Sequence, residues 1–350
     1  MLSTFALDTQ VIKKGLCTGC GACQGMCPYW GSKDGRTICY FDCERREGRC
    51  QAFCPSMPTD YKVLREKFFD PASVLPEMGP FKALYVARAT DASIREGGAQ
   101  HGGTVTALVE FALKNGFMDA AVLGGEDEKG NPAGVLATSA EEVRKASGSK
   151  FKIPPTLATL NKALAADEYK KIGVVATPCK AKAVYKMKSK PLPEKDNNAD
   201  NIGLVIGLFC GWGLEWDGLT ELSAKTAEGE KVCHSDILPS KYHSMEFTTE
   251  SGTKSVDLDE VLPLVREVCK TCDDMTCEFS DLSVGGARTG DGWAVDKGWN
   301  QVIIRSEKGA ELFQTALEAG VIEIRETPEG ALDKIKVASA NKKAKAGGQR

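Results

Sequence analysis

The sequence lacks three features that would place it in large protein classes. Its longest hydrophobic run, IGLVIGLFCGWGL at 202–214, falls short of the roughly 20 residues needed to cross a bilayer, so we expect no membrane span. Its formal net charge of −3 offers no basic surplus, which argues against nucleic acid as a partner. Its N-terminal stretch MLSTFALDTQVIKKG has neither a sustained apolar segment nor an evident cleavage site. We therefore expect a cytoplasmic protein without a secretory signal.

Common catalytic patterns are missing as well. The three histidines, His101, His234 and His243, are too scattered along the chain to suggest a zinc hydrolase, and there is no G-x-S-x-G sequence. The glycine-rich stretch at 95–108 is neither G-x-G-x-x-G nor a Walker loop. The acidic stretch CDDMTCEFSD favours solvated loop charges over a pair of catalytic carboxylates.

Cysteine is what the chain has in abundance. The 350 residues predict two or three domains, and eight of the 14 cysteines lie between Cys17 and Cys54. Disulfide frameworks belong mostly to short secreted chains. In a chain without an export signal, this crowding favours metal ligation.

Two cysteine runs near the N-terminus have the spacing of an iron–sulfur module. The stretch CTGCGACQGMCP follows C-x2-C-x2-C-x3-C-P, which is typical of bacterial ferredoxins, where the fourth cysteine serves the other cluster. A looser C-x3-C-x6-C-x3-C-P run follows it. The less favoured alternative is a pair of zinc sites. With the usual exchange, one 4Fe–4S cluster would take Cys17, Cys20, Cys23 and Cys54, and the other would take Cys39, Cys43, Cys50 and Cys27.

The remaining chain alternates strand-like and helix-like segments, which is the pattern of an α/β domain. Apolar runs such as 83–90, 119–125, 170–177 and 201–210 predict strands, and 104–116 has helical spacing and ends at a glycine. We therefore expect a ferredoxin-like module over 1–60, a proline-rich linker over 61–80, an α/β (mixed α+β) domain over 81–335, and a disordered basic tail over 336–350.

Glycines and cysteines mark further candidate sites in the second domain. The stretch REGGAQHGGTVTAL at 95–108 puts four glycines before a helix start, where an anion such as a pyrophosphate is favoured, although a plain tight turn is equally compatible. Cys179 and Cys210 each follow an apolar strand, where ligands usually bind in α/β folds. Together with Cys269 and Cys272 they could supply four ligands, although a lone buried cysteine is most often a small hydrophobe.

The order of these motifs resembles the beta subunits of coenzyme F420-dependent hydrogenases and dehydrogenases. The segments that carry the resemblance are HGGTVTALVEFALKNGFMDAAV, GSKF, VVATPCKA, GLFC and CKTCDDMTCEFSDLSVGG followed by GWNQVIIRS. Together with the ferredoxin-like start they cover about residues 10 to 310.

The resemblance implies an iron–sulfur flavoprotein that binds FAD in its α/β domain. The residues it places near the flavin are Gly102, Gly103, Thr104, Thr106, Gly148, Ser149, Lys150, Thr177 and Pro178, with His101 as the candidate catalytic residue. A third 4Fe–4S cluster would be held by Cys179, Cys210, Cys269 and Cys272. Cys277 stands where the family has a non-ligand residue and is the alternative fourth ligand, and Cys233 is expected to be a bystander.

The function that the resemblance implies is the coupling of two-electron to one-electron chemistry. Coenzyme F420 would exchange a hydride at FAD, and single electrons would pass through the clusters to or from ferredoxin or another subunit of a hydrogenase, formate dehydrogenase, heterodisulfide reductase-type or quinone-linked complex. Such a complex could bring the chain to a membrane as a peripheral subunit. Two alternatives stay open: a ferredoxin-linked flavin reductase that acts on another small molecule, and a relay subunit without flavin.

Overall fold

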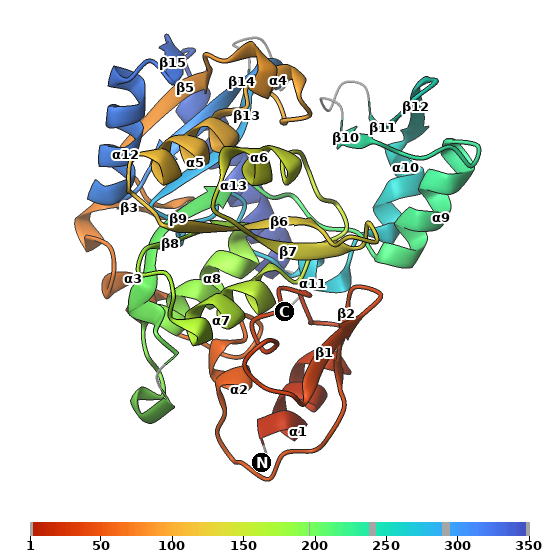
Figure 1. Cartoon of the computed structure of the whole chain (residues 1–350), viewed down its shortest axis with the longest axis vertical. Helices are drawn as coiled ribbons and strands as arrows, with labels where there is room; N and C mark the ends of the chain where they lie inside the picture. The colour runs from red at the N-terminus through yellow and green to blue at the C-terminus, as the bar shows by residue number, and fades with distance from the viewer. Residues whose placement is uncertain (1–2, 196, 238–242, 289–294, 348–350) are drawn as a thin grey trace.

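A large mixed sheet forms the centre of the protein. The computed structural model describes residues 3–195, 197–237, 243–288 and 295–347 (Figure 1). Eight strands lie in the order β15-β5-β14-β13-β9-β8-β6-β7. The inner strands β13, β9, β8 and β6 pair in parallel, and the pairs toward both edges are antiparallel. In chain order the strands are β5 (Ala83–Ala89), β6 (Ala120–Glu126), β7 (Pro132–Ala137), β8 (Ile172–Ala176), β9 (Ile202–Leu208), β13 (Leu282–Arg288), β14 (Val295–Ile304) and β15 (Ile322–Arg325).

The inner strands are apolar on both faces because helices cover both. On β6, Val122 packs into one hydrophobic cluster, and its neighbours Ala121 and Leu123 pack into the other, as the two-residue period of a strand requires. We call the face that carries Ala121 and Leu123 the first face and the face that carries Val122 the second. The helices that cover the first face are α4 (Ala92–Glu96), α5 (Thr104–Lys114), α6 (Ala140–Lys145) and α12 (Glu307–Glu318), and those that cover the second are α7 (Thr156–Ala166) and α8 (Pro178–Lys188) (Figure 1).

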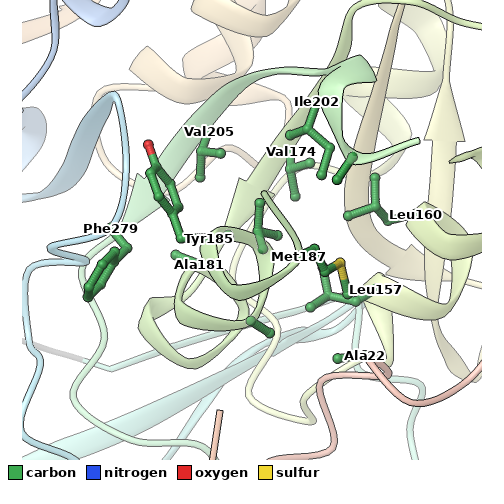
Figure 2. Close-up of a cluster of buried hydrophobic side chains, with 14 of the residues drawn as sticks. Ala22, Leu157, Leu160, Val174, Ala181, Tyr185, Met187, Ile202, Val205 and Phe279 are labelled. Carbon is green, nitrogen blue, oxygen red and sulfur yellow. The ribbon is translucent and has the colours of Figure 1, made fainter. Parts of the chain in front are cut away.

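The second face contains the cluster drawn in Figure 2. Leu157 and Leu160 of α7 and Ala181 and Met187 of α8 pack against the sheet, and Tyr185 stacks on the ring of Phe69 with the ring centroids 5.4 Å apart. Ala22 of the N-terminal module belongs to the same cluster. The module is therefore joined to the α/β domain through this cluster, and it also has a smaller apolar cluster of its own around Leu7, Val11 and Trp30.

The N-terminal module lies beyond the α7–α8 layer (Figure 1). It contains little regular structure, because most of it consists of the cysteine-bearing loops. Its elements are α1 (Ser3–Leu7), a π-helix (Asp8–Ile12), β1 (Trp30–Lys33), β2 (Arg36–Cys39) and α2 (Arg49–Phe53).

The stretch expected to be a linker is packed structure. Phe69 contacts Tyr185 and Phe279, and Arg65 forms a 2.8 Å ion pair with the buried Glu278. The lack of a clean sequence period reflects short elements rather than a loose connector. These elements are α3 (Tyr61–Glu66), a 3-10 turn (Pro71–Ser73), β3 (Val74–Leu75) and β4 (Gly79–Pro80).

The disordered tail expected over 336–350 is corrected by the structure. Residues up to Gly347 form the helix α13 (Ala331–Gly347), which buries Ile335 and Ser339. Lys343 pairs with Glu278 at 2.5 Å, and the Nζ of Lys342 donates to the carbonyl of Cys210 at 2.7 Å. Two of the lysines that suggested a solvated tail, Lys342 and Lys343, are thus satisfied by specific acceptors. Residues 348–350 lie outside the described residues.

A further substructure follows β9 and was not expected from the sequence. A three-stranded antiparallel sheet lies beside α9 and at a distance from the central sheet (Figure 1), and it has its own apolar cluster around Leu214, Met245 and Phe247. None of the described helices is both long and apolar enough to cross a membrane. The elements are α9 (Trp216–Thr226), β10 (His234–Ile237), β11 (Ser244–Thr249), β12 (Gly252–Asp257), α10 (Leu258–Val261) and α11 (Glu267–Lys270), with a 3-10 turn at Leu262–Leu264. Two further 3-10 turns, Pro193–Lys195 and Ala199–Asn201, precede β9.

Candidate functional site

The first cysteine group combines the loop before β1 with the residue that follows α2. Burial, with smaller contributions from the thiols of Cys179 and Cys54, raises the pKa of Cys20 to about 12. Burial also holds the pKa of Cys23 well above its ordinary value, and the thiols of Cys17, Cys20 and Cys54 add to the effect, with a smaller contribution from Cys50 of the second group. The structure therefore brings together the four cysteines that the ferredoxin spacing assigned to one cluster.

The second cysteine group draws on the loop before β1, the end of β2, the loop that follows it, and α2. Cys27, Cys39 and Cys50 contribute to one apolar cluster, which also contains Cys17, Cys23 and Cys54 of the first group. Burial raises the pKa of Cys39, and Cys50 is among the groups whose charge adds to this shift. Cys43 is half-buried in the loop between β2 and α2. The placement is compatible with the assigned exchange, in which Cys27 joins this group.

The third group gathers at the sheet. Cys179 is the second residue of α8, Cys210 follows β9, and Cys269 and Cys272 lie in and just after α11. Burial raises the pKa of Cys210 to about 12, and the thiols of Cys179, Cys269 and Cys272 add to it. Burial likewise raises the pKa of Cys269 to about 11, although a 3.3 Å hydrogen bond from the amide of Gly213 opposes the shift.

The topology explains why these four residues meet. β8 and β9 are parallel neighbours, so the residues that follow their carboxyl ends lie at the same edge of the sheet. The amide of Cys210 donates to the carbonyl of Met275 at 2.9 Å, which holds the loop after α11 beside the end of β9. The structure thus brings the two strand-end cysteines, Cys179 and Cys210, close to the C-x2-C pair of Cys269 and Cys272.

The two remaining cysteines, Cys277 and Cys233, are not part of the three cysteine groups. Cys277 is fully buried, and its thiol donates to the carbonyl of Ala176 at 3.4 Å. A Cβ added at Gly207 would lie 2.9 Å from this sulfur, so the thiol fills the space beside β9. Cys233 is exposed just before β10.

The glycine-rich loop before α5 is shaped by residues with positive φ. Gly98, His101 and Gly103 have φ values of +94°, +54° and +68°. Gly102 leaves no room for a side chain, because a Cβ there would lie 2.8 Å from the Oδ1 of Asn300. Thr104, which opens α5, donates its amide and its hydroxyl to the same Oδ1 at 3.2 and 2.9 Å. Thr106 is buried in the first turn of α5.

A second glycine turn adjoins this loop. Gly148 has φ +86°, and a Cβ there would lie 2.8 Å from the carbonyl oxygen of Gly98 and 3.6 Å from the Nδ1 of His234. Ser149 is half-buried, and Lys150 donates from its Nζ to the carbonyl of Ser147 at 2.8 Å. Burial lowers the pKa of Lys150. The structure thus brings both glycine segments together.

Thr177 and Pro178 belong to the third cysteine group in this geometry. Thr177 precedes α8 as its N-cap, and its Oγ1 lies 3.5 Å from the sulfur of Cys179. Pro178 is the first residue of α8, a position that tolerates its missing N–H.

The strand that faces the glycine loop has no signal in the sequence. His234 of β10 is next to Gly148, and Asp236 of β10 accepts a 3.1 Å hydrogen bond from the Nε2 of Gln100. The substructure after β9 therefore adds a wall to this site. Because β10 is short and polar, its residues read as loop in the sequence.

The N-terminal module is docked through its backbone carbonyls. Asn161 donates from Nδ2 to the carbonyls of Ala22 and Gln24 at 3.0 and 2.7 Å. The guanidinium of Arg266, which is 4% exposed, donates to the carbonyls of Gly35 and Cys17 at 3.2 and 3.0 Å. Two further donors, the amide of Leu157 and the Nζ of Lys186, reach the carbonyls of Cys20 and Cys54 at 2.9 and 2.6 Å.

Replacing Gly25 with alanine should disturb this docking. Gly25 has φ +78°, and an added Cβ would lie 2.3 Å from the carbonyl oxygen of Ala158 in α7. Positive φ alone costs an alanine on the order of 1–3 kcal/mol. Gly130 is the matched control, because it has the same φ of +78° with no atom within 4 Å of its added Cβ. Limited proteolysis should cut Gly25→Ala faster than Gly130→Ala, and equal rates would contradict the docking role.

The donor sets fit the cofactors that the sequence suggested. Four thiols per group is the ligand set of a 4Fe–4S cluster, and crowding buried thiols disfavours their ionised form unless a cation compensates for it. The adjoining glycine turns, the start of α5 and the half-buried Lys150 fit an anionic pyrophosphate, such as that of a dinucleotide.

Comparison with known protein families finds matches over most of the α/β domain. Residues 84–161 match the family model for the N-terminal part of the beta subunit of coenzyme F420 hydrogenase/dehydrogenase. Residues 169–330 match the family model for the C terminus of the same beta subunit. The helix α13 begins at Ala331, just beyond this second match.

Individual relatives extend the similarity. The chain is 30% identical over 272 residues to the coenzyme F420 hydrogenase subunit beta of Methanococcus voltae, covering 76% of this chain and 93% of that protein. It is 27% identical over 339 residues to a subunit of the F(420)H(2) dehydrogenase of Methanosarcina mazei, covering 93% of this chain and 89% of that protein. A chain of the F420-reducing NiFe hydrogenase complex from Methanosarcina barkeri superimposes with a TM-score of 0.69 at 27% identity, covering 79% of this chain and 93% of that one.

Proposed function

The chain belongs to the family of coenzyme F420 hydrogenase/dehydrogenase beta subunits, and from this we propose that it is an FAD- and iron–sulfur-dependent electron-transfer subunit that reacts with coenzyme F420. Single electrons would travel through three 4Fe–4S clusters to or from a partner protein. The observation that carries the proposal is the arrangement of the three cysteine groups. Two lie in the N-terminal module, and the third lies in the α/β domain, which also contains the two adjoining glycine turns. Relatives named as hydrogenase and dehydrogenase subunits support a partner of that kind.

The flavin site we propose is the space bounded by the loop 97–103, the turn at Gly148 and β10. Asn300 fixes the start of α5 by accepting two hydrogen bonds from Thr104. The first amides of α5 and the ammonium of Lys150 would bind the pyrophosphate, because both favour negative charge. His101 and His234 would border the reacting end of the site and orient the substrate. A bound flavin would convert between hydride transfer and single-electron transfer, which the clusters require.

Reduced coenzyme F420 should reduce a viologen dye in the presence of the purified protein. The protein is prepared anaerobically, its clusters are reconstituted, and FAD released on denaturation is quantified beforehand. Dye reduction that depends on both F420 and FAD is the expected result. Full FAD occupancy without dye reduction by F420 would overturn the F420 assignment and favour the ferredoxin-linked reductase. Cluster absorbance without any FAD would favour the flavin-free relay.

A further inference from the structure

A buried lysine lies at the junction of two cysteine groups. Lys180 follows Cys179 in the first turn of α8 and is 4% exposed. Its Nζ donates a 2.8 Å hydrogen bond to the Oγ1 of Thr156, the first residue of α7. Lysine is among the residues least often fully buried, since burial removes its charge from water.

The acceptor of this hydrogen bond leads directly to the N-terminal module. Leu157 is adjacent to Thr156, and its amide donates to the carbonyl of Cys20 at 2.9 Å. A continuous path of covalent and hydrogen bonds therefore runs from Cys179 through Lys180, Thr156 and Leu157 to Cys20. The two cysteines at its ends belong to different groups, the third and the first. They are also electrostatic neighbours, because Cys179 contributes to the raised pKa of Cys20.

The charges around Lys180 come from both groups. Its hydrogen-bond acceptor Thr156 is neutral, and the thiols that act on it electrostatically are those of Cys179, Cys20 and Cys210. A cluster ligated by four thiolates is an anion whose negative charge grows by one on reduction. A nearby ammonium stabilises the reduced form more than the oxidised form, and burial strengthens this effect.

We propose that Lys180 is a positioning residue that sets the reduction potentials of two neighbouring clusters, and that Cys179 and Cys20 form the crossing point, the place where electrons pass between these clusters. This proposal rests on the proposed cluster assignments. In each crossing one electron would pass between the cluster held by Cys179, Cys210, Cys269 and Cys272 and the cluster held by Cys17, Cys20, Cys23 and Cys54. The cluster that gives up the electron would be oxidised and the other would be reduced. The cluster assigned to Cys27, Cys39, Cys43 and Cys50 is then the outer one.

Another lysine of α8 provides a matched comparison. Lys186 donates to the carbonyl of Cys54 at 2.6 Å and to the Oγ1 of Thr59 at 2.7 Å. The thiols that act on it are those of Cys54 and Cys20, both in the first group. Lys186 should therefore affect one cluster, whereas Lys180 should affect two.

The test is a potentiometric titration followed by electron paramagnetic resonance, with dithionite as the reductant, so that neither F420 nor FAD is needed. Lys180→Gln keeps a hydrogen-bond donor and removes the charge. It should make reduction of both neighbouring clusters less favourable by about tenfold each, or about 59 mV for one electron. Lys186→Gln should shift only the first cluster, and Lys180→Arg should stay near the wild type. Unchanged potentials in a Lys180→Gln protein with full iron content would overturn the proposal.

A second measurement uses the unmodified protein and does not depend on whether a variant folds. When both clusters are reduced, their signals should show magnetic interaction because the clusters are neighbours. Two independent signals would overturn the crossing point. Failure of the proposed function would give a different result. A wild-type protein that holds no iron and no acid-labile sulfide after reconstitution would contradict the cluster assignments themselves.

Discussion

The variant Cys272→Ser is expected to lose one cluster and to interrupt electron transfer between the α/β domain and the N-terminal module. Cys272 lies with Cys210 and Cys269 at the edge of the sheet, and its raised pKa reflects burial. Without this ligand about four of about twelve iron atoms should be missing, because one of the three proposed 4Fe–4S clusters would not be retained. Electrons from reduced coenzyme F420 should then no longer reach the clusters of the N-terminal module. Iron analysis and electron paramagnetic resonance after addition of reduced F420 measure the two effects.

Cys277 supplies the matched control only five residues away. Its thiol donates to the carbonyl of Ala176, and a serine hydroxyl can keep that hydrogen bond. Cys277→Ser should therefore retain the full iron content and the reduction of the N-terminal clusters. The reverse pattern, with loss of iron in Cys277→Ser and not in Cys272→Ser, would show that Cys277 is the fourth ligand.

The largest loss of stability is expected from Arg305→Ala. Arg305 follows β14 and is 1% exposed. It donates from Nη1 to the carbonyls of Met78 and Pro80 at 2.7 and 2.6 Å, and from Nη2 to the carbonyl of Thr276 at 2.8 Å. Its removal leaves these buried acceptors without a donor and opens a cavity. The nearby carboxylates of Asp274 and Glu278, which favour the charged guanidinium, would also lose a compensating charge.

We expect Arg305→Ala to lower the free energy of unfolding by about 3–5 kcal/mol, as measured by chemical denaturation. Arg144→Ala is the surface control. Arg144 is 42% exposed and pairs with Glu110 at 2.7 Å and Asp91 at 3.1 Å. Exposed pairs of this kind contribute about 0–1 kcal/mol. Similar losses in the two variants would contradict the structural role that we assign to Arg305.

The central strands could be predicted from the sequence because their apolar runs are continuous. The segments around 83–90, 119–125, 170–177 and 201–210 contain β5, β6, β8 and β9. The strands β10 to β12 were missed, because they are short, largely polar and form a small separate sheet. The side chains of β10 and β12 do not alternate regularly in burial, so neither their period nor their composition distinguishes these two strands from loops, whereas β11 does alternate.

The cysteine groups were predictable from spacing and strand ends, whereas the lysines around them were not. A lysine in a sequence is most often solvated, and nothing local distinguishes Lys180 or Lys186 from Lys188 on the same helix. Lys342 was assigned to a disordered tail, yet its Nζ donates to the carbonyls of Cys210 and Gly211. Which lysines face a cysteine group depends on how α8 and α13 pack, and that is a tertiary property.

The docking of the N-terminal module has a consequence for how such chains can diverge. Asn161, Arg266 and Lys186 all bind main-chain oxygens of the module. Every residue carries such an oxygen, so mutations on the module's side of the contact preserve the acceptors provided that the loops keep their path. Selection should therefore hold the three donors and the close-packed glycines fixed, while the module's outer surface remains free to adapt to different redox partners.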